Sequence, residues 1–405
     1  MSSVYVARQP IFEVGRGLYG YELLYRRDIA IDHADGDDTH MSADVIANAL
    51  LSVGIHSISG GRLVFVNFSR GQLLDRSWEL FDPENVVIEL LERVENNCET
   101  LAACREMTSA GYKLALDDFV ADERMHPLVE LASIVKIDVL NRPVADLRGV
   151  ADQLRPSGVR LLAERVETAS VRDVCTDLGY ELFQGYLFSR PETLTKSDVS
   201  ASHLAVVQLL NLLQNPDTPD SALDAAFQSD VALCYKLLRI VNAAALGGRS
   251  IKSIPHAVRL VGREMLHRWL AVLLVSSLGR DGDVSRELAL TAITRARMCE
   301  LVTVASVERR HAGSAFIVGL LSLLDVLLEI PMPTILARLE LSEDVKGALL
   351  ARHGPLGTPL QLVEAYEKAN WDAARGLALE SAVPHETIPR LYFDALHWAS
   401  EQIAA

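Results

Sequence analysis

The chain has 405 residues, 49% of them hydrophobic, and this length predicts a globular protein of two or three domains. It carries 39 Lys and Arg against 54 Asp and Glu, a formal net charge of −15. Such an acidic chain repels the phosphate backbone, so we do not expect it to bind a nucleic-acid polymer. A small anionic substrate stays compatible with this charge, because bound divalent cations would set the local potential.

The N-terminus and the cysteines bear on location. The first residues, MSSVYVARQPIF, lack the basic region and the long apolar stretch of a signal peptide. Five scattered cysteines without CxxC spacing predict neither a disulfide framework nor a zinc site. The most apolar segment, 315–330, is short for a bilayer crossing and contains Asp325. We therefore expect a cytoplasmic protein with no membrane segment, in which 315–330 forms a buried helix.

The first half, from residue 4 to about residue 191, alternates short runs rich in Val, Ile and Leu with stretches of helical periodicity. This order predicts a parallel sheet, and the lack of polar alternation predicts that both faces are covered, as in a barrel or a doubly wound sheet. The predicted strands lie in RLVFVNFS at 62–69, NVVIELLE at 85–92, YKLALDDF at 112–119, SIVKIDVL at 133–140 and VRLLAERVE at 159–167. This half has the size of a small (β/α)8 barrel.

Polar side chains interrupt these runs near the carboxyl ends of the predicted strands. They are Asn67, Glu89, Asp117 with Asp118, Lys136 with Asp138, and Glu164. In a barrel these ends open on one face, so the side chains would converge there. Five carboxylates in one place carry a large negative charge, which is costly unless cations lie between them.

Oxygen ligands of this kind favour Mg²⁺, Mn²⁺ or Ca²⁺ over zinc or copper. Two such ions ~4 Å apart would clamp the attacking and leaving oxygens of a phosphodiester, so we hypothesise metal-assisted phosphoester hydrolysis. Each acid alone is more often a solvated turn residue, and Glu164 with Glu167 could equally lie in the first turn of a helix. The hypothesis depends on the recurrence at successive strand ends.

A polar segment, PETLTKSDVSASH at 191–203, separates the two halves, and we expect domains at 1–195 and 196–405. Beyond this segment the pattern is helical nearly throughout, and we see no strand pattern. Predicted helices include HLAVVQLLNLL at 203–213, DVALCYKLLRIVNAAA at 230–245 and IPHAVRLV at 254–261.

The first half resembles the EAL domain of cyclic di-GMP phosphodiesterases, a modified TIM barrel. The similarity runs through RQPIF at 8–12, YELLYR at 21–26, VNFS at 66–69, ELLE at 89–92, DDF at 117–119, KID at 136–138, AERVET at 163–168 and QGYLFSRP at 184–191, in the family's order. The resemblance implies cyclic di-GMP as the substrate, pGpG as the product and a two-metal site for Mg²⁺ or Mn²⁺.

The resemblance also implies a role for individual residues. The ligands of the first ion would be Glu22, Asn67, Glu89 and Asp117, with Asp118 shared with or given to the second. Lys136 would orient the attacking water and the phosphate, Glu164 would hold or deprotonate that water, and Glu167 would support the loop after the aspartates. Gln184 would complete the site, and Arg26 would contact a substrate phosphate.

Three positions differ from the family's pattern. Val120 and the loop behind it replace a glycine and a loop rich in Gly and Ser, Leu23 replaces an alanine beside Glu22, and Arg165 replaces a glycine after Glu164. None of these changes removes a ligand, but each could shift one, and a displacement of ~1 Å can lower a rate about a hundredfold.

The second half resembles the HDOD domain, a helical relative of the HD phosphohydrolases, through YKLLRIVNAAA at 235–245, SIPHAVRLVG at 253–262 and AFIVGLLSLLD at 315–325. Ser322 and Leu323 stand where the His-Asp metal pair of those enzymes would fall, and Arg295 and Arg297 where an earlier histidine is expected. We therefore expect neither metal nor hydrolysis in this half.

Three functions stay open from the sequence. The first is a phosphodiesterase regulated by the HDOD domain, through which it would contact an unidentified protein partner, and the chain could form a homodimer. The second is a receptor that binds cyclic di-GMP without hydrolysing it. The third is a scaffold whose two domains only dimerise and dock other proteins.

Overall fold

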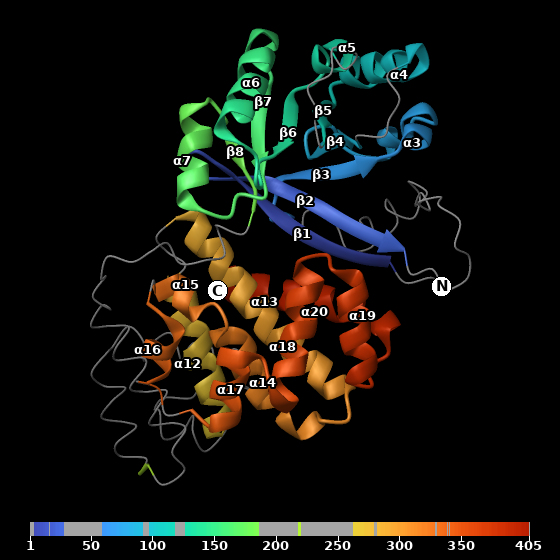
Figure 1. The fold of residues 1–405 in the computed structure, drawn as a ribbon. Coiled ribbons are helices and arrows are strands. Elements are labelled where there is room, and N and C mark those ends of the chain that lie inside the picture. The colour runs from blue at the N-terminus through green and yellow to red at the C-terminus, as the bar shows by residue number, and fades with distance from the viewer. Residues whose placement is uncertain are drawn as a thin grey trace.

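The computed structural model describes residues 4–15, 17–27, 59–91, 97–117, 126–185, 218–219, 262–278, 282–328, 330–337, 339 and 341–404. Within them an eight-stranded closed barrel is followed by a helical region, which confirms the predicted fold class (Figure 1). The predicted domain boundary at 195 and the predicted helices at 203–213, 230–245 and 254–261 lie outside the described residues.

The strands of the barrel follow one another in chain order. They are β1 (Val4–Glu13), β2 (Leu18–Arg27), β3 (Leu63–Phe68), β4 (Val86–Leu90), β5 (Lys113–Leu116), β6 (Ile134–Asp138), β7 (Arg160–Glu164) and β8 (Leu182–Phe183). The pairs from β2 to β8 are parallel, whereas β1 runs antiparallel to both β2 and β8. The five predicted strands are β3 to β7 and are confirmed.

Short helices follow the strands on the outside of the barrel. They are α3 (Arg70–Leu74), α4 (Cys98–Ser109), α5 (His126–Val129), α6 (Val144–Leu154) and α7 (Ala169–Asp177), with 3-10 turns η1 (Ser77–Leu80) and η3 (Arg155–Ser157). Ser69, Asn97 and Thr168 cap α3, α4 and α7, each accepting a hydrogen bond from a backbone N–H of the first turn. These caps start helices close behind strand ends, which fixes the strand ends in space.

The interior of the barrel contains a small apolar layer beneath its open end. It consists of Ile11, Phe65, Val87, Ala115, Ile134, Leu162 and Leu182, all fully buried. Successive side chains of a strand point to opposite faces, so residues two positions further along also face the interior. The opposite faces of the strands pack against the outer helices in a separate core.

The helical region follows the barrel in the chain. Its helices are α12 (Arg263–Leu278), α13 (Asp283–Ala305), α14 (Ala312–Leu321), α15 (Leu324–Leu328), α16 (Met332–Leu336), α17 (Glu343–Ala351), α18 (Gly354–Glu367), α19 (Trp371–Glu380) and α20 (Ile388–Ala404), with 3-10 turns η5 (Arg309–His311) and η6 (His385–Thr387). No strand occurs among the described residues after 185. Gly319 of α14 lies directly against the backbone of Arg295 and Ala296, so the two helices approach closely.

The described residues of the apolar segment 315–330 are mostly buried, as predicted, but they do not form one uninterrupted helix, because α14 ends at Leu321 and α15 begins at Leu324. By length and composition, Arg309–Leu328 passes as a candidate membrane span, with a mean hydropathy of 1.8. However, 56% of the window is buried inside the protein, and the core helix of a soluble protein passes the same test.

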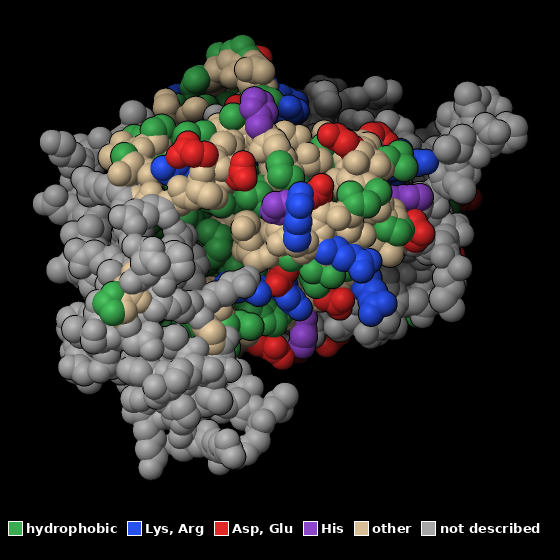
Figure 2. Space-filling view, turned by 90° about the horizontal axis from the view of Figure 1, so that it is seen from below, with side chains coloured by type: hydrophobic (Ala, Val, Ile, Leu, Met, Phe, Trp, Pro, Cys, Tyr) green, Lys and Arg blue, Asp and Glu red, His purple; other side chains and the backbone are tan. Residues whose placement is uncertain are grey.

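The barrel and the helical region share part of a core. Tyr5 and Ala7 of β1 belong to the buried apolar cluster of the helical region, and α18 and α20 both contact β1. In Figure 1, β1 and β2 lie between the rest of the barrel and the helices. The far face of the helical region, seen in Figure 2, shows Lys and Arg side chains interspersed with Asp and Glu over its described part. The described part of this face therefore carries both signs of charge.

Candidate functional site

A polar layer lies above the apolar layer of the barrel. Each member stands two residues beyond an interior apolar residue: Asn67 after Phe65, Glu89 after Val87, Asp117 after Ala115, Lys136 after Ile134, Glu164 after Leu162 and Gln184 after Leu182. The alternation of strand side chains therefore turns all six toward the barrel axis. Glu22 of β2 joins them through its contacts.

Lys136 stands at the centre of this layer, with 1% of its side chain exposed. Its Nζ forms ion pairs with four carboxylates: Glu22 Oε2 at 3.2 Å, Glu89 Oε1 at 2.5 Å, Asp117 Oδ1 at 3.0 Å and Glu164 Oε1 at 2.9 Å. The structure thus brings together acids from β2, β4 and β7 and from the end of β5. Convergence at the strand ends, inferred from the sequence, is what the geometry shows for these residues.

The carboxylate of Glu22 is held from two more sides. Gln184 Nε2 donates to Glu22 Oε2 at 2.7 Å, and Asn67 Nδ2 lies 3.5 Å from Glu22 Oε1. Each amide therefore directs its nitrogen to Glu22, which leaves its carbonyl oxygen available to another partner. The position of Glu22 is fixed by two amides and one ammonium.

Gly185 allows the end of β8 to approach the turn after β7. Its φ is +148°, and an added Cβ would lie 2.3 Å from the backbone nitrogen of Val166. That same nitrogen donates to the carbonyl of Gln184 at 3.0 Å. A side chain at 185 would separate these segments, so the glycine keeps Gln184 beside Glu164.

The charges of the layer do not balance, because one ammonium faces four carboxylates. Burial would lower the pKa of Lys136, but the four carboxylates outweigh it and hold that pKa well above its ordinary value. Burial raises the pKa of Glu89 strongly and that of Glu164 to about 8, in each case against the attraction of Lys136 and with the help of neighbouring acids. Without a further cation, the layer retains protons instead of full charge.

The donor atoms of the layer fit a hard divalent cation. Asn67 Oδ1, Glu89 Oε2 and Gln184 Oε1 are buried and lack any hydrogen-bond donor, and carboxylate and amide oxygens are the ligands that Mg²⁺, Mn²⁺ and Ca²⁺ prefer. Among the described residues, however, no three His, Cys, Asp or Glu side chains are grouped to hold an ion. The four carboxylates converge on the ammonium of Lys136.

Two of the predicted site residues, Glu167 and Arg26, lie outside the polar layer, and a third is not described. Asp118 is outside the described residues, as is Val120. Glu167 is exposed and lines a cavity of about 620 Å³ between the barrel and the helical region. Arg26 forms an exposed ion pair with Asp372 of α19 at 3.2 Å.

The two described departures from the family pattern have different consequences. Leu23 is buried in the core outside the barrel, on the face of β2 opposite to Glu22, so its bulk does not lie in the polar layer. Arg165 adopts a left-handed φ of 56°, the conformation for which a glycine is best suited. Its guanidinium pairs with Asp138 at 2.8 Å, and Asp138 is not among the partners of Lys136.

Tyr25 was not predicted as part of the site. Its buried hydroxyl donates to the backbone carbonyl of Asn67 and thereby ties the end of β2 to the end of β3. A tyrosine three residues after Glu22 gives no local signal of this role, because the partner is a backbone atom of another strand.

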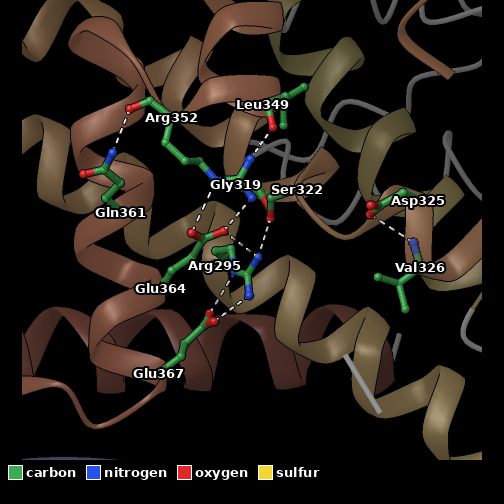
Figure 3. Close-up of polar contacts among 10 residues, drawn as sticks. All are labelled: Arg295, Gly319, Ser322, Asp325, Val326, Leu349, Arg352, Gln361, Glu364 and Glu367. Carbon is green, nitrogen blue, oxygen red and sulfur yellow. Dashed lines mark hydrogen bonds and ion pairs between the residues drawn. The ribbon is translucent and has the colours of Figure 1, made fainter. Parts of the chain in front are cut away.

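The helical region contains a second ionic cluster, which includes Arg295 and Ser322, two of the positions singled out in the sequence (Figure 3). Arg295 Nη1 donates to Ser322 Oγ at 2.8 Å, and its Nε and Nη2 bind both oxygens of Glu367 at 3.1 and 2.6 Å. Arg352 binds Glu364 in the same two-pronged way, at 3.3 and 2.8 Å. Two arginines thus face two glutamates.

Comparisons with known proteins divide the chain in two. The family model for the EAL domain matches residues 38–191, and the model for the HDOD domain matches residues 201–332. Uncharacterized protein YuxH of Bacillus subtilis is 31% identical over 98% of this chain and 98% of its own length. Cyclic di-GMP phosphodiesterase CdgJ of Vibrio cholerae is 32% identical over 99% of this chain and 93% of its own length.

Part of the chain also matches a solved structure. The calcium and cyclic di-GMP complex of Klebsiella pneumoniae BlrP1 is 24% identical, with a TM-score of 0.37. The match covers 46% of this chain and 55% of that one.

Proposed function

Because this chain belongs to the family of proteins that join an EAL domain to an HDOD domain, we propose that it hydrolyses cyclic di-GMP to pGpG. The observation that carries the proposal is the buried polar layer, in which four carboxylates and two amides surround Lys136. The proposal assigns catalysis to residues 1–195 and regulation to residues 196–405. It includes a protein partner for the helical domain, a homodimer and action in the cytoplasm.

The site would use Mg²⁺ or Mn²⁺, held by the oxygens of Glu22, Asn67, Glu89, Asp117 and Asp118. Bound there, the cations would compensate the excess negative charge and stabilise the charge that develops on the phosphoryl oxygens. The unsatisfied oxygens of Asn67 and Glu89 support this assignment. The similarity to a cyclic di-GMP phosphodiesterase over nearly the whole chain supports the substrate.

Hydrolysis adds one water across a phosphodiester bond. The oxygen of the water forms a bond to phosphorus, the bond from phosphorus to the ribose 3′ oxygen breaks, and the 3′ oxygen leaves with a proton as a hydroxyl. Glu164 is suited to accept the proton of the water, because its carboxylate lies in the same polar layer, 2.9 Å from Lys136 Nζ. Lys136 would orient the water and the phosphate.

Arg26 would contact a phosphate of the substrate at the end of β2. In the structure it pairs with Asp372, but both side chains are more than half exposed, at 55% and 81%. Such a pair is weak and would exchange readily for a phosphate. Gln184 keeps Glu22 in place during this exchange.

The test is chromatographic. Purified protein is incubated with cyclic di-GMP and Mn²⁺, and pGpG is separated and quantified. We expect product from the native chain and a loss of at least about a hundredfold in Glu22→Ala, because that change removes a ligand that two amides and Lys136 position. The matched control is Glu106→Ala, an exposed glutamate of α4 that pairs only with Arg76 among the described residues, which should behave as the native chain. Absence of pGpG from the native chain would contradict the proposal.

A second candidate is a receptor that binds cyclic di-GMP without hydrolysing it. One observation favours it: Lys136 already contacts an oxygen of each of the four carboxylates, so the layer is partly neutralised without a metal. Equilibrium dialysis of cyclic di-GMP in EDTA separates the two candidates. A receptor binds the nucleotide and yields no pGpG when Mn²⁺ is added.

A further inference from the structure

A buried polar joint connects the helical domain to the barrel at Glu287 of α13. One oxygen of Glu287, Oε2, accepts a hydrogen bond from the hydroxyl of Tyr21 on β2 at 2.7 Å. The other, Oε1, accepts from Arg8 Nη2 on β1 at 3.0 Å. The side chains of Arg8 and Glu287 are only 7% and 8% exposed. One carboxylate thus holds two neighbouring strands of the barrel.

The joint is internally consistent, because its two strand residues also contact each other. The guanidinium of Arg8 lies over the ring of Tyr21, 4.2 Å from its centroid. In this stacking the Tyr21 hydroxyl and an N–H at the edge of the guanidinium both donate to Glu287. In such an arrangement a shift of α13 cannot move one strand without the other.

The joint lies directly behind Glu22. Tyr21 is the residue before Glu22, and side chains of adjacent strand residues point to opposite faces, so Tyr21 meets α13 while Glu22 enters the barrel. Across the strand pair, Gln9 is the register partner of Glu22, and Arg8 is the residue before Gln9. Glu287 therefore binds β1 and β2 from the outside of the barrel. The residues that it contacts on the two strands are the neighbours of Glu22 and of its register partner Gln9.

Other contacts hold the same two strands further from Glu22. Asp283, one turn before Glu287, accepts from the backbone nitrogen of Leu18 at 2.9 Å. The Tyr366 hydroxyl of α18 donates to the carbonyl of Val6 at 3.1 Å. These bonds fix the ends of the strand pair, and Glu287 acts in between.

We propose that Glu287 is a positioning residue of the helical domain, which sets the place of Glu22 in the barrel site and transmits movements of α13 to it. The inference rests on the proposed function for the role of Glu22 as a ligand. It is specific to this pair of domains, since the residue that positions the barrel acid comes from the helical domain. Loss of the hydrogen bonds from Arg8 and Tyr21 to Glu287 should weaken metal binding, because residues that orient metal ligands typically contribute about 10- to 100-fold in affinity.

The test compares two buried glutamates of α13 in the full chain. Glu287→Ala removes the joint, whereas the control Glu300→Ala removes a glutamate that pairs with Arg268 and Arg297 inside the helical domain. Calorimetric titration with Mn²⁺ gives the affinity, and hydrogen exchange gives the mobility of β2, Leu18–Arg27. We expect Glu287→Ala to weaken Mn²⁺ binding about tenfold and to speed exchange in β2. Glu300→Ala should change neither.

Two further variants guard against a merely structural effect. Both alanine variants should lower the thermal midpoint of unfolding, so a lower midpoint does not distinguish a positioning role from a structural one. Glu287→Gln should restore part of the Mn²⁺ affinity, because it keeps an acceptor for the Tyr21 hydroxyl. Tyr21→Phe, which loses only the hydroxyl, should weaken Mn²⁺ binding in the same direction as Glu287→Ala. Equal affinity and equal β2 exchange in Glu287→Ala and Glu300→Ala would overturn the inference.

The outcome can be separated from that of the proposed function. If the native chain binds Mn²⁺ but yields no pGpG, the proposed hydrolysis fails and the Mn²⁺ affinities of the variants still decide the role of Glu287. If the native chain binds no Mn²⁺, the proposed function fails and the exchange of β2 decides. Faster hydrogen exchange of β2 in Glu287→Ala than in Glu300→Ala then supports the positioning role of Glu287, and equal exchange refutes it.

Discussion

The two buried ionic clusters of the molecule differ in how their charges are matched. In the helical domain two arginines meet two glutamates, each pair closed by two hydrogen bonds (Figure 3). In the barrel a single lysine faces four carboxylates. The barrel cluster is buried and the helical cluster largely so, but only in the helical cluster are the charges matched in number.

This difference in charge matching indicates that the barrel cluster, and not the helical one, is the expected site of chemistry. In the helical cluster burial would lower the pKa of Arg295, but its two glutamates outweigh that and hold the pKa above its ordinary value. In the barrel cluster burial and like charges raise the pKa of Glu89 and Glu164, and three oxygens lack donors. A fold does not need such an imbalance for stability, and a bound cation would relieve it.

The largest effects should come from removing the central cation of each cluster. Lys136→Met leaves four buried carboxylates and Arg295→Met leaves two glutamates with one arginine, so each should lose about 3–5 kcal/mol of unfolding free energy in EDTA. Saturating Mn²⁺ should recover about 3 kcal/mol in Lys136→Met and nothing in Arg295→Met. Urea unfolding followed by circular dichroism measures both. Equal recovery in the two variants would remove the distinction between the clusters.

The second prediction concerns pH. The pKa of Glu164 rises from an ordinary 4.5 to about 8 on folding, so between these values the folded chain keeps a proton that the unfolded chain has lost. This group therefore stabilises the metal-free fold at low pH, and its contribution is lost as pH rises through 8. Mn²⁺ would favour the ionised forms of Glu164 and of the ligand Glu89, whose pKa burial also raises, so the Mn²⁺ affinity should rise at least about tenfold per pH unit from pH 6 to 8. Calorimetry at fixed ionic strength measures the slope, and a flat profile would contradict it.

The sequence predicted most residues of the barrel cluster, but it did not predict the contacts that hold either cluster in place. The recurrence of polar residues at the ends of predicted strands pointed to Asn67, Glu89, Asp117, Lys136 and Glu164, and the structure adds that each stands two residues beyond an interior apolar residue. The antiparallel β1 was not predicted. Neither was the bond of Glu287 to Tyr21, because the two residues lie 266 positions apart and nothing local marks them.

The third prediction compares two isosteric changes. Glu367→Gln breaks the two-pronged pair with buried Arg295 and should lower the unfolding free energy by about 1.5–3 kcal/mol while pGpG production stays within twofold. Glu89→Gln replaces a buried acid whose pKa is already raised well above its ordinary value, so it should change the metal-free unfolding free energy by less than about 1 kcal/mol while abolishing pGpG. Urea unfolding in EDTA and chromatography of the product measure the two quantities. A loss of stability in both variants would mean that the barrel acids are also structural.

The smallest effect on stability should come from Arg165, which lies at the rim of the polar layer of the barrel and has an exposed side chain. Its φ of 56° strains any side chain, and its pair with Asp138 is formed by a side chain that is 62% exposed. Arg165→Ala and Arg165→Gly both lose this pair, which is worth about 0–1 kcal/mol. Only glycine relieves the strain, of about 1–2 kcal/mol, and it loses part of that gain to the freedom of the unfolded chain. Thermal unfolding should therefore show Arg165→Gly more stable than Arg165→Ala by about 0.5–1 kcal/mol, and the reverse order would mean that the left-handed turn at 165 is not strained.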